Sequence, residues 1–396
     1  MKHEREKCPS ILITRGRVIT PFEEIPGADV LIRGERIEAV GRRLRPASGA
    51  VTIDAKGCYV APGLIDLHTQ GGCGHDVWDA TPESLMGWSR CNARHGVTSY
   101  LITTGYGTSG YNFMAEHIDL AGVAAKPLGV YLESPFCSMI KRGGIDASRV
   151  GPVSMKMLDK ICRKLGRSLR MMTVAPERKG AIAMIRELRR RSIIAAIGHT
   201  DCTYDQALEA MDAGATHVTH CFNTMRSLHH REPGPLPALL TDPRVTIELV
   251  LDGHHIHPAV ISMAVRLRGT DHTCVITDNM RVAGLPDGNY TFEKAGREIR
   301  VTGGVPRLAD GTIAGSTLTM DRALANVVKF TGLTVREALP MLTATPARAV
   351  GYGDRKGQLA RGFDADVVLF NNRFEIQRTI VSGRTVYLRG KDVPKG

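Results

Sequence analysis

The stretch LGVYLES, residues 128–134, is a short apolar run that ends in one acidic residue, Glu133. Nearly continuous apolar residues of this length are typical of a parallel strand that is covered on both faces. Helical patterns separate such runs, for example residues 81–96, which open with Thr81 as an expected N-cap. Seven further runs occur along the chain, at 64–68, 97–103, 169–175, 193–199, 215–220, 245–252 and 274–278. Eight alternating units predict an α/β fold, a parallel (β/α)8 barrel of the TIM type.

Both ends of the chain differ from this central part. Residues 10–60 and 364–390 contain short segments in which apolar and polar residues alternate, punctuated by glycine. A chain of 396 residues also exceeds what one hydrophobic core usually supports. We therefore expect a small β-sandwich domain made from residues 1–60 and 356–396, beside a hydrolase barrel that covers residues 61–355.

Charge and composition restrict the class of protein. The first ten residues are charged, and no apolar stretch follows that is long enough for a signal peptide or a membrane span, so we expect a cytoplasmic protein without a membrane partner. The net charge is +12, but the arginine-rich segment 177–192 has the pattern of an amphipathic helix. Its basic residues lack interleaved aromatics, which disfavours nucleic acid as a partner. The positive charge fits attraction of an anionic substrate instead.

The cysteines give no sign of a disulfide framework. There are nine of them, scattered along the chain and without a C-x-x-C pair. This distribution predicts reduced, mostly buried thiols. Cys221, although it follows His220, is expected to be a small core residue, because free cysteine is usually buried as a small hydrophobe.

Titratable residues stand at the ends of five of the eight predicted strands. They are His68, Glu133, His199, His220 and Asp278. The carboxyl ends of barrel strands meet at one face, where barrel enzymes place their reacting groups. One such histidine alone is more often a hydrogen-bonded structural residue, but a costly polar residue on several strands at the same level favours a site. Because carboxylate and imidazole groups bind catalytic divalent cations, the pattern predicts a metal site.

Longer motifs connect these residues to a known family. They include APGLIDLH (61–68), YLESPF (131–136), THCFNTM (219–225) and HREPG (230–234), and further matches are GHT (198–200), DGHH (252–255), TDN (277–279) and KGQLARGFDADVVLF (356–370). In this combination the chain resembles the amidohydrolase superfamily and, within it, the N-acetylglucosamine-6-phosphate deacetylase family. The resemblance implies hydrolysis of N-acetylglucosamine 6-phosphate to glucosamine 6-phosphate and acetate.

The same resemblance assigns roles to residues of this chain. It gives Glu133, His199 and His220 to one divalent metal ion, for which zinc is favoured and iron, manganese or cobalt are alternatives. It gives proton transfer, as general base and then general acid, to Asp278. It implies a homodimer, in which Arg231 binds the substrate phosphate across the interface. The expected contacts to the phosphorylated amino sugar are Asn223, Thr224, His255 and Arg231.

Several positions depart from the family pattern. Gln70 stands where many amidohydrolases have the second histidine of H-x-H, so a second metal is expected to bind weakly or not at all, with His68 as its ligand. Ile145 replaces the histidine of a K-K-G-x-H-like segment and cannot hydrogen-bond a sugar hydroxyl. Ser134 and Thr224 replace the usual glycine and alanine. Two alternatives therefore stay open: an amidohydrolase for another N-acyl amino-sugar phosphate, such as N-acetylgalactosamine 6-phosphate, and a catalytically silent barrel.

A run of three histidines near residue 255 could suggest a metal cluster of its own. Along His254, His255 and His257, alternation of side chains predicts that only one of them points into the site. We therefore expect no second cluster there.

Overall fold

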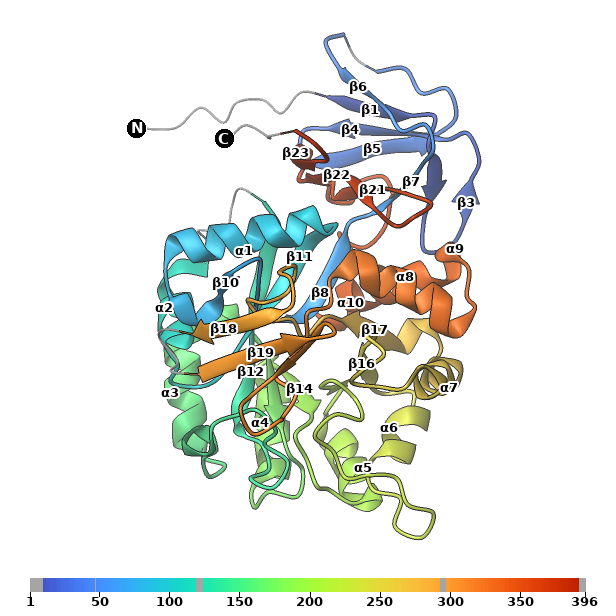
Figure 1. Ribbon diagram of the computed structural model, residues 1–396. Helices are drawn as coiled ribbons and strands as arrows, with labels where there is room; N and C mark the ends of the chain where they lie inside the picture. Colours follow the sequence, from blue (N-terminus) through green and yellow to red (C-terminus); the bar gives the residue numbers. More distant parts are fainter. Residues whose placement is uncertain (1–9, 47, 119–123, 293–296, 392–396) are drawn as a thin grey trace.

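A computed structural model describes residues 10–46, 48–118, 124–292 and 297–391 of the chain. It has a barrel surrounded by helices and a smaller β-rich unit packed at one end (Figure 1). The charged stretch at residues 1–9, which includes Cys8, lies outside the described residues.

The centre of the molecule is one parallel sheet of eight strands that follow one another in chain order. The ends of this sheet meet, because the Asp278 N–H donates to the His68 carbonyl at 2.8 Å and Thr69 forms a parallel bridge with Asn279. All eight predicted strands are present, and the predicted (β/α)8 fold class is confirmed. The strands are β8 (Leu64–Thr69), β11 (Val97–Thr104), β12 (Lys126–Phe136), β13 (Leu169–Val174), β14 (Ile194–Ile197), β15 (His217–Val218), β16 (Thr246–Val250) and β17 (Thr273–Ile276).

Helices cover the outside of this sheet. Thr81 accepts a hydrogen bond from the Ser84 N–H and so caps the first of them, as the sequence predicts. The arginine-rich segment is an amphipathic helix that buries Met184, Ile185 and Leu188. None of the helices within the described residues has both the length and the apolar character that a membrane span requires. The helices are α1 (Pro82–Arg94), α2 (Ser109–His117), α3 (Met155–Leu165), α4 (Ala181–Arg190), α5 (Tyr204–Ala213), α6 (Leu236–Thr241), α7 (Pro258–Arg268), α8 (Met320–Thr331), α9 (Val335–Ala338) and α10 (Ala344–Ala349).

Both ends of the chain share the smaller β-rich unit. In its six-stranded sheet, β7 pairs with β2 from the N-terminal segment and with β21 from the C-terminal segment. This is the expected sandwich, although its boundaries at residues 60 and 356 stay a prediction, since β7 itself continues to Pro62. The strands are β1 (Ile11–Thr14), β2 (Arg17–Ile19), β3 (Glu24–Ile25), β4 (Asp29–Arg33), β5 (Arg36–Gly41), β6 (Val51–Asp54), β7 (Cys58–Pro62), β21 (Val367–Asn371), β22 (Ile376–Val381) and β23 (Arg384–Leu388).

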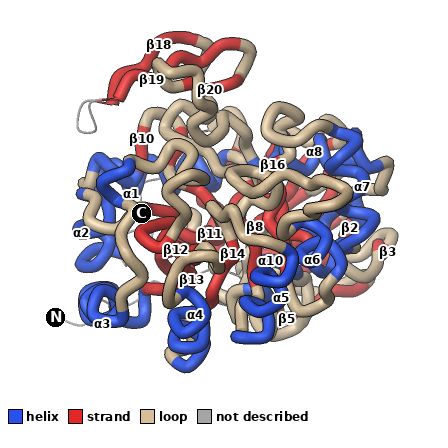
Figure 2. The backbone as a smooth tube through the Cα atoms, turned by 90° about the horizontal axis from the view of Figure 1, so that it is seen from below, coloured by secondary structure: helices blue, strands red, loops and turns tan. Residues whose placement is uncertain are grey.

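A three-stranded antiparallel flap, which the sequence reasoning did not predict, follows the last barrel strand. It consists of β18 (Gly288–Phe292), β19 (Arg297–Thr302) and β20 (Val305–Arg307). Figure 2 shows it standing beyond the body of the barrel. Ile299 and Val301 pack with Val282 in a small core of their own. Because the flap is inserted after β17, it lies at the face where the strands end.

The cysteine prediction is wrong for one pair. Cys73 and Cys91 form a disulfide between a hairpin after β8, made of β9 (Gly71–Gly72) and β10 (His75–Asp76), and helix α1. The two residues are separated by 18 positions, and only the fold brings them together. The other described cysteines are free thiols, and Cys221 is fully buried, as expected.

Candidate active site

The backbone takes a left-handed conformation at three of the predicted site residues. Glu133 lies within β12, whereas His199, His220 and Asp278 each follow the end of a strand. These last three have φ angles of +45°, +24° and +47°. Left-handed backbone is unfavourable for residues other than glycine, and such strain clusters at functional sites. This backbone conformation directs the side chains into the open end of the barrel.

Three of the predicted ligands converge on one point. Glu133 Oε1 lies 2.9 Å from His199 Nε2 and 3.0 Å from His220 Nε2, and the two imidazole nitrogens are 3.1 Å apart. A tetrahedral cation with bonds of about 2.0–2.1 Å spaces its ligand atoms about 3.3 Å apart. The observed spacing is close to that value, and two facing imidazole nitrogens need a proton or a cation between them. The geometry and the donor chemistry therefore fit a divalent metal ion.

His68 completes the polar floor of the site. Its Nε2 is fully buried, lies 3.7 Å from Glu133 Oε1 and 3.5 Å from Asp278 Oδ1, and has no hydrogen-bond partner within the described residues. Burial favours the neutral ring, but the negative charges of Glu248 and Asp278 outweigh it and raise the pKa of His68 to about 10. The ligand atoms of His68, Glu133 and His220 lie within 4.8 Å of one another. His68 can therefore contribute to a cation site, but it is not the ligand that lies closest to Glu133.

A buried carboxylate that sequence reasoning missed holds these histidines. Glu248, on β16, lies 3.1 Å from His68 Nδ1 and 2.9 Å from His217 Nε2, and it accepts the His220 N–H at 3.0 Å. Burial opposes its charge, yet the charge of His68 and the hydrogen bond of His217 lower the pKa of Glu248 to about 2. Glu248 thus fixes one candidate ligand through its ring and another through its backbone. The available signal was an acid in the middle of the apolar run VTIELVLD.

Asp278 is held in position by the residue that departs from the H-x-H pattern. Gln70 Nε2 donates to Asp278 Oδ1 at 3.1 Å, and the Gln70 N–H donates to the carbonyl of Asn279. Asp278 is 8% exposed, so it is sheltered but reachable from the cavity. A glutamine here supplies a donor to the carboxylate where a histidine would supply a metal ligand.

The three converging ligands, together with Gln70 and Asp278, line one cavity of about 320 Å³. Asn223, Thr224 and His255, three of the predicted substrate contacts, are among its lining residues. His254 also lines it, whereas His257 does not, and which side chain of that run points into the site stays a prediction. His255 is oriented by Asp252, at 2.6 Å between Nδ1 and Oδ2. Burial opposes the charge of His255, but this hydrogen bond raises its pKa.

Of two further residues that the sequence singles out, Ile145 lines the cavity and Arg231 does not. Ile145 lies in the cavity wall, and Arg149 and the flap residue Ile299 are also among the lining residues. Arg231 is exposed on a loop, with its Nη1 at 2.8 Å from His230 Nε2, and is not one of the cavity-lining residues. Within one chain the structure therefore does not bring Arg231 to the site.

Comparison with known proteins finds a family and relatives that this chain resembles over most of its length. A model of the amidohydrolase family matches residues 59–386. The N-acetylgalactosamine-6-phosphate deacetylase of Escherichia coli O157:H7 is 37% identical over 330 residues, which cover 82% of this chain and 87% of that protein. The N-acetylglucosamine-6-phosphate deacetylase of Bacillus subtilis is 33% identical over 391 residues, 96% of this chain and 98% of that protein.

A solved structure of a related protein has the same fold. A mutant of the Mycobacterium smegmatis N-acetyl-D-glucosamine-6-phosphate deacetylase, in complex with N-acetyl-D-glucosamine-6-phosphate, superimposes with a TM-score of 0.88 and 32% identity. The match covers 96% of this chain and 99% of that one.

Proposed function

The chain belongs to the amidohydrolase family, and on that basis we propose that it hydrolyses N-acetylglucosamine 6-phosphate to glucosamine 6-phosphate and acetate. It is a hydrolase that acts on an amide bond. The observation that carries the proposal is the convergence of Glu133, His199 and His220 on one point, with Asp278 in the same cavity. The activities named for the relatives from Bacillus subtilis and Mycobacterium smegmatis support this substrate.

The metal ion belongs to the proposal as well. Glu133, His199 and His220 would hold one divalent cation, and His68 lies beside it. One carboxylate and two imidazoles suit zinc, with iron, manganese or cobalt as alternatives. When bound, such a cation lowers the pKa of a water molecule and polarises the amide carbonyl.

The protein's own groups handle the proton. Asp278 accepts the proton of the attacking water at one carboxylate oxygen while Gln70 holds Oδ1, and it then returns the proton to the departing nitrogen. His255, fixed by Asp252, lines the cavity, and its other ring nitrogen would donate to the carbonyl oxygen or to the sugar. A buried site of this kind strengthens each of these interactions, because it excludes bulk water.

We further propose a homodimer in which Arg231 reaches the phosphate of substrate bound to the partner subunit. Arg231 is exposed, and a guanidinium is well suited to phosphate oxygens. Equal amounts of Arg231→Ala and Asp278→Asn chains, refolded together, would then regain about a quarter of the wild-type activity, because half of the dimers are mixed and have one complete site. Activity that stays at the level of the two single variants would refute the shared site. Absence of nucleic-acid and membrane partners, and a cytoplasmic location, stay predictions.

A specific observation keeps N-acetylgalactosamine 6-phosphate as the second candidate. Ile145 lies in the cavity wall, where the family segment has a histidine that contacts the sugar. The Escherichia coli O157:H7 relative named for the galacto substrate is also similar over most of its length. The two hexosamines differ only in the orientation of one hydroxyl, so a changed hydrogen-bond donor in the wall bears directly on the choice.

The deciding experiment measures acetate release with and without a bound divalent metal. The substrates are the gluco and galacto 6-phosphates and the same sugars without phosphate. We expect metal-dependent release, fastest from N-acetylglucosamine 6-phosphate and much slower from both unphosphorylated sugars. Faster release from the galacto isomer would instead assign that substrate. If the metal-loaded protein releases acetate from none of these four sugars, the catalytically silent barrel would be favoured.

A further inference from the structure

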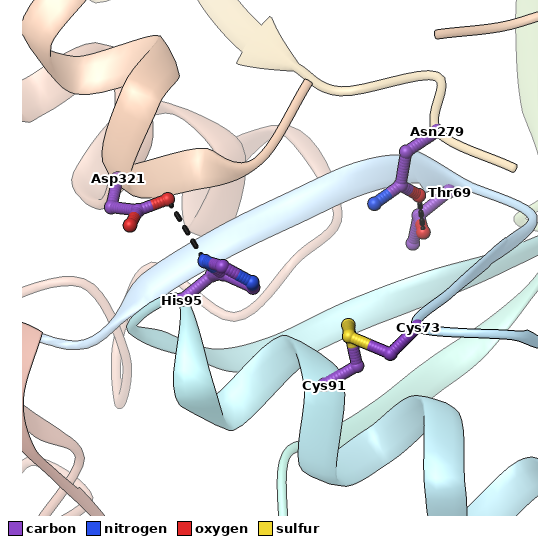
Figure 3. The surroundings of a disulfide bond; sticks show 6 residues. All are labelled: Thr69, Cys73, Cys91, His95, Asn279 and Asp321. Atoms are coloured by element: carbon purple, nitrogen blue, oxygen red, sulfur yellow. Dashed lines mark hydrogen bonds and ion pairs between the residues drawn. A yellow bond between two sulfur atoms is a disulfide. The ribbon is translucent and has the colours of Figure 1, made fainter. Parts of the chain in front are cut away.

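A second group of metal-binding side chains lies outside the cavity, at the contact between a hairpin and helix α1. It consists of Cys73, between β9 and β10, Cys91 on α1, and His95 at the end of that helix (Figure 3). Each offers one ligand atom, and these atoms lie within 4.8 Å of one another. Cys91 and His95 are four positions apart, so they lie on the same face of the helix end. None of the three lines the active-site cavity.

His95 is oriented as metal-binding histidines usually are. Its Nδ1 lies 3.1 Å from Oδ1 of Asp321, on α8, as Figure 3 shows. A carboxylate in this place fixes the ring so that Nε2 remains available as a ligand. A side chain at Gly284 would meet Cys73 Sγ at 3.3 Å and His95 Nε2 at 3.8 Å. The sulfur and the nitrogen therefore face the same small space, which the glycine leaves open.

We propose that Cys73, Cys91 and His95 form a binding site for a soft divalent cation such as Zn²⁺ when the two cysteines are reduced. Two thiolates and one imidazole are a preferred donor set for zinc, and water can supply the fourth ligand. A disulfide requires neither His95 nor the Asp321 carboxylate that orients it. A metal site requires the imidazole as a ligand and the carboxylate to position it. The disulfide and the metal site are thus two states of the same three residues.

A dithiol reductant can convert the disulfide state into the metal-binding state. The reductant gives two electrons and two protons to the Cys73–Cys91 bond, which breaks into two thiols, while its own sulfurs close into a disulfide. The cation then binds the sulfurs and releases their two protons to solvent. The sulfurs must move apart to about 3.7 Å, the edge of a tetrahedron with bonds near 2.3 Å. Gly72 and Gly74, on either side of Cys73, give the hairpin freedom for this shift.

Either state would fix the β9–β10 hairpin, which follows Gln70 of the active site, against helix α1. The Cys73 N–H donates to the Ala283 carbonyl at 2.8 Å, and the preceding Gln70 donates to Asp278. Thr69 and Asn279 are also hydrogen-bonded to each other (Figure 3). A metal at Cys73 would therefore keep this hairpin in place under reducing conditions, where disulfides are rare.

Cobalt binding to the whole chain tests the proposal. The chain is reduced with a phosphine, freed of reductant without air, and titrated with Co²⁺, which gives a near-ultraviolet charge-transfer band only when sulfur is a ligand. We expect the band, and an additional bound equivalent, in the reduced protein but not in protein oxidised with diamide. The candidate ligands of the catalytic site are one carboxylate and imidazoles, with no thiolate among the described lining residues, so the band is independent of the proposed activity.

Variants locate the ligands. Cys73→Ser and His95→Gln should each lose the additional equivalent, and Asp321→Asn should weaken its affinity about 10–100-fold. Cys162→Ser, which removes a free thiol on α3, is the matched control and should keep the band. Circular dichroism checks folding, and the histidine variant keeps the test valid if the cysteine variant misfolds. Absence of the band from reduced wild-type chain, or a band unchanged in His95→Gln, would overturn the proposal.

Discussion

Replacing Glu248 by glutamine should weaken metal binding without removing any metal ligand. The carboxylate has three contacts: Oε2 with His68 Nδ1 and the His220 N–H, and Oε1 with His217 Nε2. Glutamine keeps one acceptor oxygen, so at least one of these charge-assisted hydrogen bonds is lost, which costs about 1.5–3 kcal/mol. Because the loss falls on the groups that fix the metal ligands, we expect metal affinity to fall about 10–100-fold.

The assay separates positioning from catalysis. Metal content is measured by competition with a chelator, and kcat is measured at saturating metal. Glu248→Gln should recover most of its kcat when metal is added, because Asp278 and Gln70 are untouched. Glu187→Gln, which neutralises a half-buried carboxylate paired with Arg190 on α4, away from the cavity, is the control and should behave as wild type. If Glu248→Gln binds metal within about twofold of wild type, the role assigned to Glu248 is refuted.

Three further changes test other parts of the site and fold. Asp278→Asn should retain metal but lose about 10²–10⁴-fold in kcat at saturating metal, because the general base is gone; near-normal turnover would remove the assignment. Ile145→His should shift the gluco-to-galacto ratio of kcat/KM about tenfold toward the gluco substrate, through one added hydrogen bond, and an unchanged ratio would exclude this wall position from sugar recognition. Asp364, paired with Arg355 and Lys356, has a pKa that burial alone would raise but that Lys356 lowers. A carboxyl group whose pKa is lowered in the folded state stabilises the fold at pH values above its unfolded pKa, near 4, and loses that effect as the pH falls. Asp364→Asn should therefore unfold at a lower temperature than wild type at pH 7, and the difference in unfolding temperature should narrow in acid. A difference that does not change with pH would contradict the charge argument.

The barrel and the candidate ligands could be predicted because both are local in the sequence. A parallel strand covered on both faces appears as an apolar run, and the residue that ends it needs no knowledge of neighbouring strands. Glu133, His199, His220 and Asp278 were all found in this way, and the fold brings them to one cavity.

What sequence reasoning missed depends on pairs that only the fold creates. Cys73 and Cys91 meet because a hairpin after β8 packs against α1, and no spacing rule signals that contact. The flap is similar: β18 and β19 are short exposed strands whose apolar residues, such as Ile299, pack against one another and the cavity rather than the main core. Their alternation is too brief to separate from a loop.

Glu248 shows why the support of a site is harder to find than its ligands. Within VTIELVLD a single acid looks like an interruption of a buried strand, and an isolated buried carboxylate is unfavourable. It becomes favourable only because His68 and His217 approach from two other strands, and neither contact is visible from its neighbours in the chain. A charged residue inside an otherwise apolar barrel strand should therefore be taken as a sign of partners across the barrel. Here those partners include a residue next to the proposed metal, which makes Glu248 a positioning residue for His68 and His220.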